Sequence, residues 1–137
     1  MSRYVSETLR NFVIKRANSR CEYCKIHLEN SFFTFHLEHI ISIKHGGKTV
    51  QENLALACPI CNLNKGSDVA TFIEDIEVMI RFYNPRIDKW DEHFTLESTG
   101  FISSKSIIGN ATVKILNLNH PDSIIERREM IRLNLIE

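Results

Sequence analysis

Two pairs of cysteines constrain this chain more than any other feature of its 137 residues. Cys21 and Cys24 are separated by two residues, and so are Cys58 and Cys61. Each pair can present two thiolates from one tight turn, and together they supply the four ligands of a tetrahedral structural zinc site. The other interpretations are buried free thiols or two disulfides. The spacing favours a Zn²⁺ site that joins two distant parts of the chain.

We expect the cysteines to be reduced, because nothing in the sequence indicates export. The N-terminus lacks an apolar run ending in small residues, and no stretch approaches the roughly 18 consecutive apolar residues of a membrane-spanning helix. We therefore expect a cytoplasmic protein without a membrane partner, in which closely spaced cysteines indicate metal binding. The composition, with 43% hydrophobic and 25% charged residues, is that of an ordinary folded protein. The length predicts one domain spanning 1–137.

Charge is unevenly distributed, although the formal net charge is zero. Residues 1–20 carry five basic side chains and one acid, whereas residues 67–97 carry three basic side chains and eight acids. A polyanion should therefore meet the first half of the chain. The periodicity predicts a helix over 5–16 with a basic face of Arg10, Lys15 and Arg16, which serves either phosphate contact or simple solvation.

The sequence between and after the cysteine pairs predicts short, mixed elements. The pairs are separated by 33 residues (25–57), more than a small zinc ribbon needs, so that this insert should hold the function. The expected elements are a strand within 32–43, a glycine turn at 45–48, a strand over 54–57, a helix starting near 61, short strands within 95–102, and helices over 107–118 and 121–131. Apolar positions in 69–83 fit a helix, and those in 78–83 also fit a strand.

Several motifs coincide in order within the insert and around the second cysteine pair. They are His36-Leu37-Glu38-His39, Gly46-Gly47, Asn53, and Asn62 directly after Cys61. The run CEYC…FHLEHIISIKHGGKTVQENLALACPICNLNKGSD resembles the HNH endonuclease family, in its zinc-stapled, small stand-alone bacterial branch. FYNPRIDKWDEHF and GNATVKILNLN…IIERR resemble the C-terminal part of such proteins. In those relatives the segment matching 69–83 is usually a loop that feeds a strand, which favours a strand over 78–83.

The resemblance implies an α+β protein with a ββα-metal (His-Me finger) core over about 18–68. A four-cysteine zinc site, an N-terminal helix and a C-terminal strand and helix extension (about 69–137) would complete the fold. It further implies metal-dependent hydrolysis of DNA phosphodiester bonds, by nicking or cutting duplex DNA, with products carrying 3′-hydroxyl and 5′-phosphate ends.

The residues of the insert suit this chemistry. Imidazole, with an unperturbed pKa of about 6.5, is well placed to deprotonate water near neutral pH, and His39 is the candidate base. Glu38 and Asn62 offer oxygens to a hard cation, for which Mg²⁺ or Mn²⁺ is the better choice. The family commonly has Asp where this chain has Glu38. The resemblance assigns Asn53 a positioning role, in which its amide bridges backbone groups of the loop that follows His39.

Other polar residues have less specific interpretations. His36 should share a strand face with Glu38, and serves as a further metal ligand, a phosphate donor or a buried structural histidine. Lys65, Lys48 and His45 are candidate phosphate contacts, with plain solvent exposure as the alternative for Lys48 and His45. Three histidines are expected to be structural: His27, His93 and His120. Arg127 and Arg128 are expected on a solvated face of the last helix.

A second function remains open at the level of sequence. A catalytically inactive, zinc-stabilised nucleic-acid-binding module would keep the same fold, and the replacement of Asp by Glu38 gives it weight. An RNA-directed nuclease would use the same residues. Cutting both strands of a duplex would be easiest for a two-fold homodimer.

Overall fold

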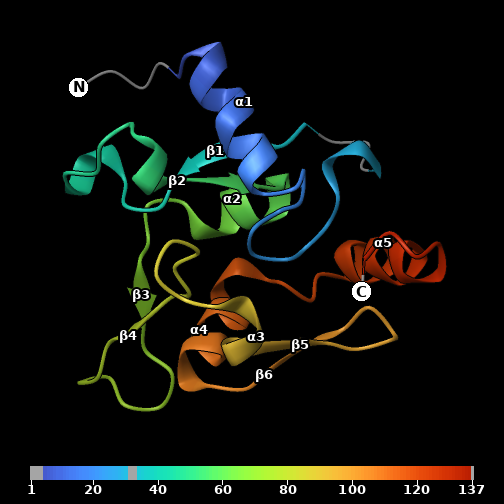
Figure 1. The fold of residues 1–137 in the computed structure, drawn as a ribbon. Helices are drawn as coiled ribbons and strands as arrows, with labels where there is room; N and C mark the ends of the chain where they lie inside the picture. The colour runs from blue at the N-terminus through green and yellow to red at the C-terminus, as the bar shows by residue number, and fades with distance from the viewer. Residues whose placement is uncertain (1–4, 31–33, 137) are drawn as a thin grey trace.

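The computed structural model describes residues 5–30 and 34–136, and its elements fall into two halves (Figure 1). The upper half holds helix α1 (Glu7–Arg16), strands β1 (His36–His39) and β2 (Leu54–Ala57), and helix α2 (Pro59–Lys65). The lower half holds the strand pairs β3 (Ala70–Thr71) with β4 (Ile80–Arg81) and β5 (Phe94–Leu96) with β6 (Ile102–Ser104), together with helices α3 (Trp90–His93) and α4 (Ile107–Leu116). Helix α5 (Pro121–Arg132) lies to one side of both halves.

Helix α1 forms where its periodicity predicts, and its end is tied to the sheet. Ser6 caps the N-terminus by accepting a hydrogen bond from the Leu9 amide (3.2 Å), and Val13 is the residue that the helix buries fully. The Arg16 guanidinium donates to the backbone carbonyls of Gln51 (2.7 Å) and Leu54 (2.6 Å). Arg16 therefore fastens α1 to β2, and is not part of an open basic face.

Strands β1 and β2 pair antiparallel, with His36 opposite Ala57 and His39 opposite Leu54. All four residues of β2 are buried. The strand expected within 32–43 is shorter than predicted, and residues 32 and 33 lie outside the described part of the chain. Two 3-10 turns, Ile43–His45 and Gln51–Asn53, fold the intervening loop back onto the hairpin. Strands β1 and β2 and helix α2 thus follow one another along the chain, and α2 contacts β1.

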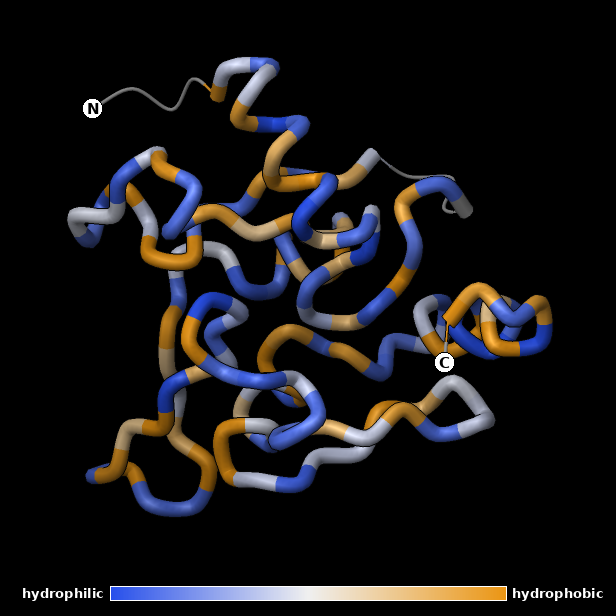
Figure 2. Tube along the Cα trace, in the orientation of Figure 1, coloured by the Kyte–Doolittle hydropathy of each residue, from blue (hydrophilic) through white to orange (hydrophobic). Residues whose placement is uncertain are grey.

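The segment 69–83 is neither the helix that its periodicity predicts nor one strand over 78–83. Strands β3 and β4 form a small antiparallel hairpin in which Ala70 faces Arg81 and Thr71 faces Ile80. The Asp75 carboxylate accepts from the Glu77 amide (2.9 Å), which turns the chain at the hairpin tip. The tip carries both hydrophobic and hydrophilic residues (Figure 2), and Ile76 is 84% exposed.

The elements of the C-terminal half were largely predictable. Helix α4 and helix α5 match the ranges expected for them to within two residues, and α5 begins with Pro121 at its first turn. Strands β5 and β6 are the expected short strands, joined by a turn at Gly100 with φ +91°.

Aromatic and polar contacts join the two halves. The Trp90 indole N–H donates to the carbonyl of Tyr23 (2.9 Å), and the Tyr83 ring lies edge-on to the rings of Tyr23 and Phe94. Helix α4 packs against α2. The extension therefore shares a core with the cysteine-bearing segment. No helix in the described ranges is both long and apolar enough to cross a membrane.

Candidate functional site

The four cysteines gather into one buried cluster. Their sulfur atoms lie within 4.8 Å of one another, and each residue is at most 3% exposed. Cys21 and Cys24 come from the turn after α1, whereas Cys58 caps the N-terminus of α2 and Cys61 lies in its first turn. Four sulfurs around one point are the ligand set of a structural zinc site. The cluster can hold a metal ion, as the spacing of the two pairs predicts.

The local backbone supports thiolate charge at this cluster. The Cys24 amide points at the Cys21 sulfur, and the Cys61 amide at the Cys58 sulfur, each at 3.4 Å. Burial raises the pKa of the Cys21 thiol, but hydrogen bonds from the other sulfurs outweigh burial and lower it well below its ordinary value.

The sulfur geometry fits zinc better than disulfides. The sulfurs of Cys24 and Cys58 are 3.5 Å apart, and all four cysteines are free thiols. A disulfide requires about 2.05 Å between sulfurs. A tetrahedral Zn²⁺ with bonds of about 2.3 Å separates its sulfurs by about 3.8 Å, close to the spacing found. The disulfide interpretation is therefore wrong for this structure, and zinc is the plausible occupant.

A cavity of about 340 Å³ brings together three of the predicted catalytic residues. Glu38 and His39 on β1 and Asn62 on α2 all line it. The rest of its wall comes from the loop after β1 and from the end of α2, at Leu37, Ser42, Ile43, Lys44, Gly66 and Ser67. Residues that carry an imidazole, a carboxylate and an amide thus line one cavity, and Asn62 directly follows Cys61 of the cysteine cluster.

The carboxylate of Glu38 is buried and already bonded. It forms an ion pair with the Lys65 ammonium (2.5 Å) and accepts a hydrogen bond from the Tyr23 hydroxyl (2.7 Å), and Glu38 is 4% exposed. Burial raises the pKa of Glu38 in spite of the neighbouring ammonium. Burial and the same carboxylate raise the pKa of Tyr23, so that Tyr23 stays a hydrogen-bond donor. Nothing in the sequence signalled the part that Tyr23 plays.

Lys65 does not contact the surface, contrary to the phosphate contact predicted for it. The residue is 2% exposed, and its ammonium also donates to the carbonyls of Ile40 (2.9 Å) and His39 (3.4 Å). The side chain leaves the last turn of α2 and crosses to the end of β1. Its role is to hold α2 against β1 at the cavity.

Replacement of Lys65 by methionine should destabilise the fold by about 3–5 kcal/mol, because it leaves the Glu38 carboxylate buried without its partner. Urea unfolding of the zinc-loaded protein measures this loss. The matched control is Lys114→Met, since Lys114 is exposed on α4 and its replacement should change stability by no more than about 0.5 kcal/mol. Equal stabilities of the two variants would contradict this account of the ion pair.

Asn53 makes the bridging bonds expected of a positioning residue. Its side-chain oxygen accepts from the Ile41 amide (2.9 Å), and its side-chain nitrogen donates to the carbonyls of Ile41 (2.9 Å) and Lys48 (3.0 Å). Gly47 lies directly beneath this clamp, where a Cβ would be 1.7 Å from the Ile41 carbonyl oxygen. The loop that follows His39 is thus closed by one amide side chain and one obligatory glycine.

Asn53→Ala should lower the free energy of unfolding by about 1–3 kcal/mol, because backbone groups of the loop lose their partners. Faster amide hydrogen exchange at Ile41 should accompany the loss. Asn64→Ala is the matched control, as its amide makes a single exposed bond to Ile60 within α2 (2.8 Å). Unchanged exchange at Ile41 in Asn53→Ala would be the contrary result.

His39 is oriented by a hydroxyl and lies between two hollows. Its Nε2 atom is 2.9 Å from the Thr49 hydroxyl, a contact that the sequence did not indicate. Besides the cavity with Glu38, His39 lines a hollow of about 320 Å³ together with Arg10 and His36. His36 is exposed on this second side and lies outside any cluster of metal-ligating residues in the described ranges. The expected pairing of His36 with Glu38 around one ion is not found.

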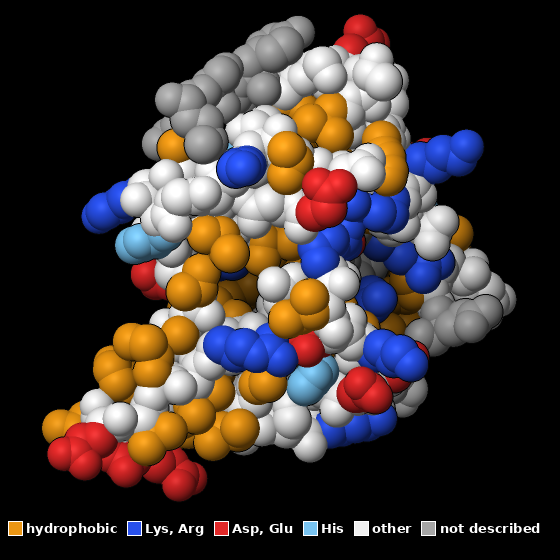
Figure 3. Space-filling view, turned by 60° about the vertical axis from the view of Figure 1, so that its left-hand side comes forward, with side chains coloured by type: hydrophobic (Ala, Val, Ile, Leu, Met, Phe, Trp, Pro, Cys, Tyr) orange, Lys and Arg blue, Asp and Glu red, His pale blue; other side chains and the backbone are white. Residues whose placement is uncertain are grey.

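The remaining residues that the sequence analysis singled out are either exposed on the surface or bonded within the fold. Lys48, His45 and Lys44 are exposed on the loop after β1. Figure 3 shows basic side chains over the centre of one face, with acidic and hydrophobic side chains together at its lower left. The three other histidines each make a local bond: His27 accepts from the Glu29 amide, His93 pairs with the Ser106 hydroxyl, and His120 caps α5 through the Asp122 amide.

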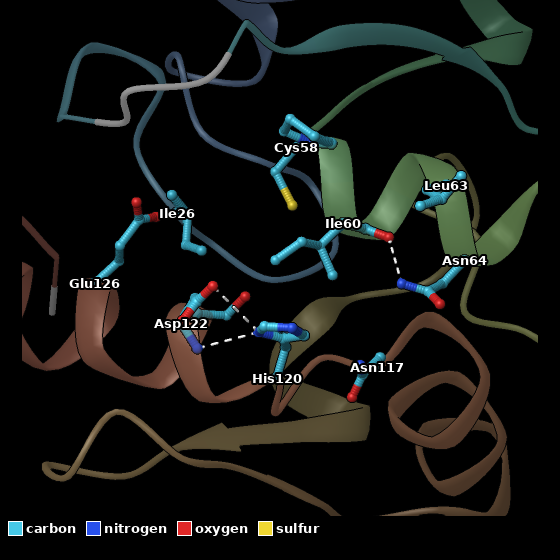
Figure 4. Close-up of a pocket in the computed structure, with 11 residues that line it drawn as sticks. Ile26, Cys58, Ile60, Leu63, Asn64, Asn117, His120, Asp122 and Glu126 are labelled. Atoms are coloured by element: carbon cyan, nitrogen blue, oxygen red, sulfur yellow. Dashed lines mark hydrogen bonds and ion pairs between the residues drawn. The ribbon is translucent and has the colours of Figure 1, made fainter.

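A further cavity, of about 420 Å³, lies between α2 and α5 (Figure 4). Ile26, Ile60 and Leu63 form much of its wall, with Glu126 and the cap pair of His120 and Asp122 at its α5 side. Of the predicted site residues, Cys58 alone lines it. Glu38, His39 and Asn62 do not line this cavity, which has a histidine, two carboxylates and two amides of its own.

The fold and these sites define a small α+β protein with short strand pairs, a four-cysteine metal-binding cluster and an adjacent polar cavity. Residues 21–68 match the family model of the HNH endonucleases. The matched segment runs from Cys21 to just beyond α2 and includes both cysteine pairs. No curated protein and no solved structure matches the chain.

Proposed function

We propose that this protein is a metal-dependent endonuclease that hydrolyses DNA phosphodiester bonds. The observation that carries the proposal is the shared cavity of Glu38, His39 and Asn62 within the segment that matches the HNH family. On this view β1, β2 and α2 are the ββα-metal core, and the whole chain is one nuclease domain with a C-terminal extension. The cysteine cluster holds Zn²⁺ as a structural ion.

His39 serves as the general base. Phosphodiester hydrolysis needs a proton acceptor within hydrogen-bond reach of the attacking water, and imidazole suits that step near neutral pH. The Thr49 hydroxyl at Nε2 fixes the orientation of the ring, and the Asn53 clamp fixes the loop that carries Thr49. Asn53 and Thr49 are positioning residues, which act through His39 and not on the substrate.

Glu38 and Asn62 would hold the catalytic cation, Mg²⁺ or Mn²⁺. A carboxylate has about four lone-pair directions, of which Lys65 and Tyr23 use two, so Glu38 retains capacity for a cation at the cavity wall. The Asn62 amide adds a second hard oxygen donor. When bound, the cation would neutralise charge on the phosphate and on the departing 3′ oxygen.

Duplex DNA would lie across His39. Arg10 flanks the histidine on one side and Lys44 on the other, each across a cavity that His39 lines, while Lys48 and His45 are exposed on the same loop. Basic groups in this arrangement contact phosphates and position the duplex without reading sequence. A two-fold dimer would allow both strands to be cut.

Purified zinc-loaded protein should convert supercoiled plasmid to nicked or linear DNA when Mg²⁺ or Mn²⁺ is added, and not in the presence of EDTA. The nicks should be resealed by DNA ligase, because ligation requires the 3′-hydroxyl and 5′-phosphate ends proposed here. Gel analysis with and without ligase measures both properties. An RNA hairpin tested in parallel shows whether RNA is the substrate instead.

The rival function is a catalytically inactive nucleic-acid-binding module, which the buried ion pair of Glu38 with Lys65 favours. Such a module would retard duplex DNA in a gel while leaving the plasmid intact at every concentration of added cation. That combination of results would replace the nuclease proposal.

A further inference from the structure

Helix α5 buries a charged side chain that the proposed nuclease mechanism does not use. Arg127 is fully buried, whereas its neighbour Arg128 is exposed, so the solvated face expected for this pair is wrong for Arg127. The guanidinium donates from Nε to the Gly100 carbonyl (2.7 Å) and from Nη2 to the Leu118 carbonyl (2.7 Å). Its third direction, from Nη1, points to the carbonyl of Cys24 at 3.4 Å.

These acceptors leave the charge of Arg127 uncompensated. They are neutral carbonyls, together with the side-chain oxygen of Asn119 at 3.3 Å, and no carboxylate of the described residues forms an ion pair with Arg127. Glu126, its neighbour in sequence, is half-buried and forms no ion pair within the described ranges, although the charge of Arg127 partly offsets the rise in the pKa of Glu126 that burial causes. A buried charge without a counter-charge is costly, so a source of negative charge is expected nearby.

The cysteine cluster is the candidate source, because the Arg127 guanidinium reaches the backbone carbonyl of Cys24. Burial lowers the pKa of Arg127, and the opposing influence comes from the sulfurs of the four cysteines. Four thiolates around one Zn²⁺ leave a net charge of about −2 in a site whose cysteines are all buried. Burial also lowers the pKa of Lys25, and Cys21 and Cys24 oppose that shift. The Lys25 ammonium, however, lies 4.9 Å from the centre of the Trp90 ring, and the residue is only half-buried.

We propose that Arg127 is the internal counter-charge of the zinc tetrathiolate, and that it couples zinc binding to the docking of the C-terminal extension. The inference rests on the proposed zinc site. One guanidinium joins the first cysteine pair, the β5–β6 turn at Gly100 and the connection between α4 and α5 at Leu118. Loss of zinc would leave this cation unbalanced and loosen α5. Loss of the Arg127 charge would lower the affinity for zinc.

The test compares R127K with R127Q, because both variants lose the forked hydrogen bonds but only the lysine keeps the charge. Zinc affinity is measured by competition with a chromophoric chelator. R127Q should bind zinc about 10- to 100-fold more weakly than the wild type, as expected when a group that supports metal ligands is removed. R127K should retain most of the affinity, and R128Q and E126Q should leave it unchanged.

Hydrogen exchange provides a second readout. Hydrogen exchange in α5 should accelerate when zinc is removed from the wild type. Equal zinc affinities for R127K and R127Q would overturn the proposal that Arg127 is the counter-charge. Weaker zinc binding by E126Q, with unchanged binding by R127Q, would also overturn it. Should R127Q not fold, a tenfold weaker affinity of R127K than of wild type would overturn it. If wild-type protein binds no zinc at all, the zinc proposal itself fails.

Discussion

Replacing His39 by alanine should reduce the rate of metal-dependent nicking by about 10²–10⁴-fold, the contribution typical of a positioned general base. The side chain lines the cavity that Glu38 and Asn62 share, and the Thr49 hydroxyl orients its ring. Single-turnover cleavage with enzyme in excess measures the chemical step without a contribution from DNA binding. Zinc content and thermal unfolding should match the wild type, because the four cysteines, and not His39, form the metal-binding cluster.

The matched control is His45→Ala, on the same loop. His45 is exposed and does not line the first cavity, so its replacement should leave the single-turnover rate within a few fold of the wild type. Any effect of His45→Ala should appear in DNA binding and weaken as salt is raised. Nicking by His39→Ala at the wild-type rate would contradict the assignment of the base.

Removal of the structural ion should have the largest effect on stability. Cys24→Ser should abolish stoichiometric zinc binding and leave the protein largely unfolded, because binding of structural zinc contributes on the order of 10–16 kcal/mol in small zinc domains. The cysteines of the cluster are buried, and helix α2, which starts at Cys58 and Cys61, packs against α4, so the loss should extend to the extension as well as to the β1–β2 hairpin. Elemental analysis and circular dichroism measure the two consequences.

The wild-type protein provides the control for this prediction. Prolonged treatment with a strong chelator under reducing conditions should unfold it, and added Zn²⁺ should restore the spectrum, whereas added Mg²⁺ should not. Zinc binds thiolates and therefore releases protons, so the restored stability should decrease as the pH is lowered. Cooperative unfolding at the same temperature with and without zinc would show that the cluster is only a set of buried thiols.

The sequence identified those features that depend on local spacing. The two cysteine pairs and the capped helices can be recognised because the signal for each lies within a few residues, and His39, Asn53 and Asn62 because their order along the chain resembles that of a known family. Periodicity wrongly favoured a helix over 69–83 because Phe72, Ile76 and Met79 recur at helical spacing yet remain exposed, whereas the resemblance favoured a strand over 78–83, within which β4 lies. In place of a core-facing helix, the Asp75 side chain supplies a turn.

The burial of single charges could not be predicted from spacing. Lys65 and Arg127 have neighbours in sequence that resemble those of solvated basic residues. Their partners, Glu38 for Lys65 and the Cys24 carbonyl for Arg127, are distant in sequence and come together only by tertiary packing. The same limit applies to Tyr23 and Thr49, whose contacts with Glu38 and His39 have no local sequence signal.

The most direct measurement is a crystal structure of the protein bound to a short DNA duplex and Mn²⁺, with anomalous diffraction locating the metal. We expect a manganese peak in the cavity between Glu38 and Asn62, with a phosphate of the duplex beside it and within reach of a water at His39. Duplex bound in register over His39, with no manganese in that cavity and with Glu38 still paired to Lys65, would contradict the account.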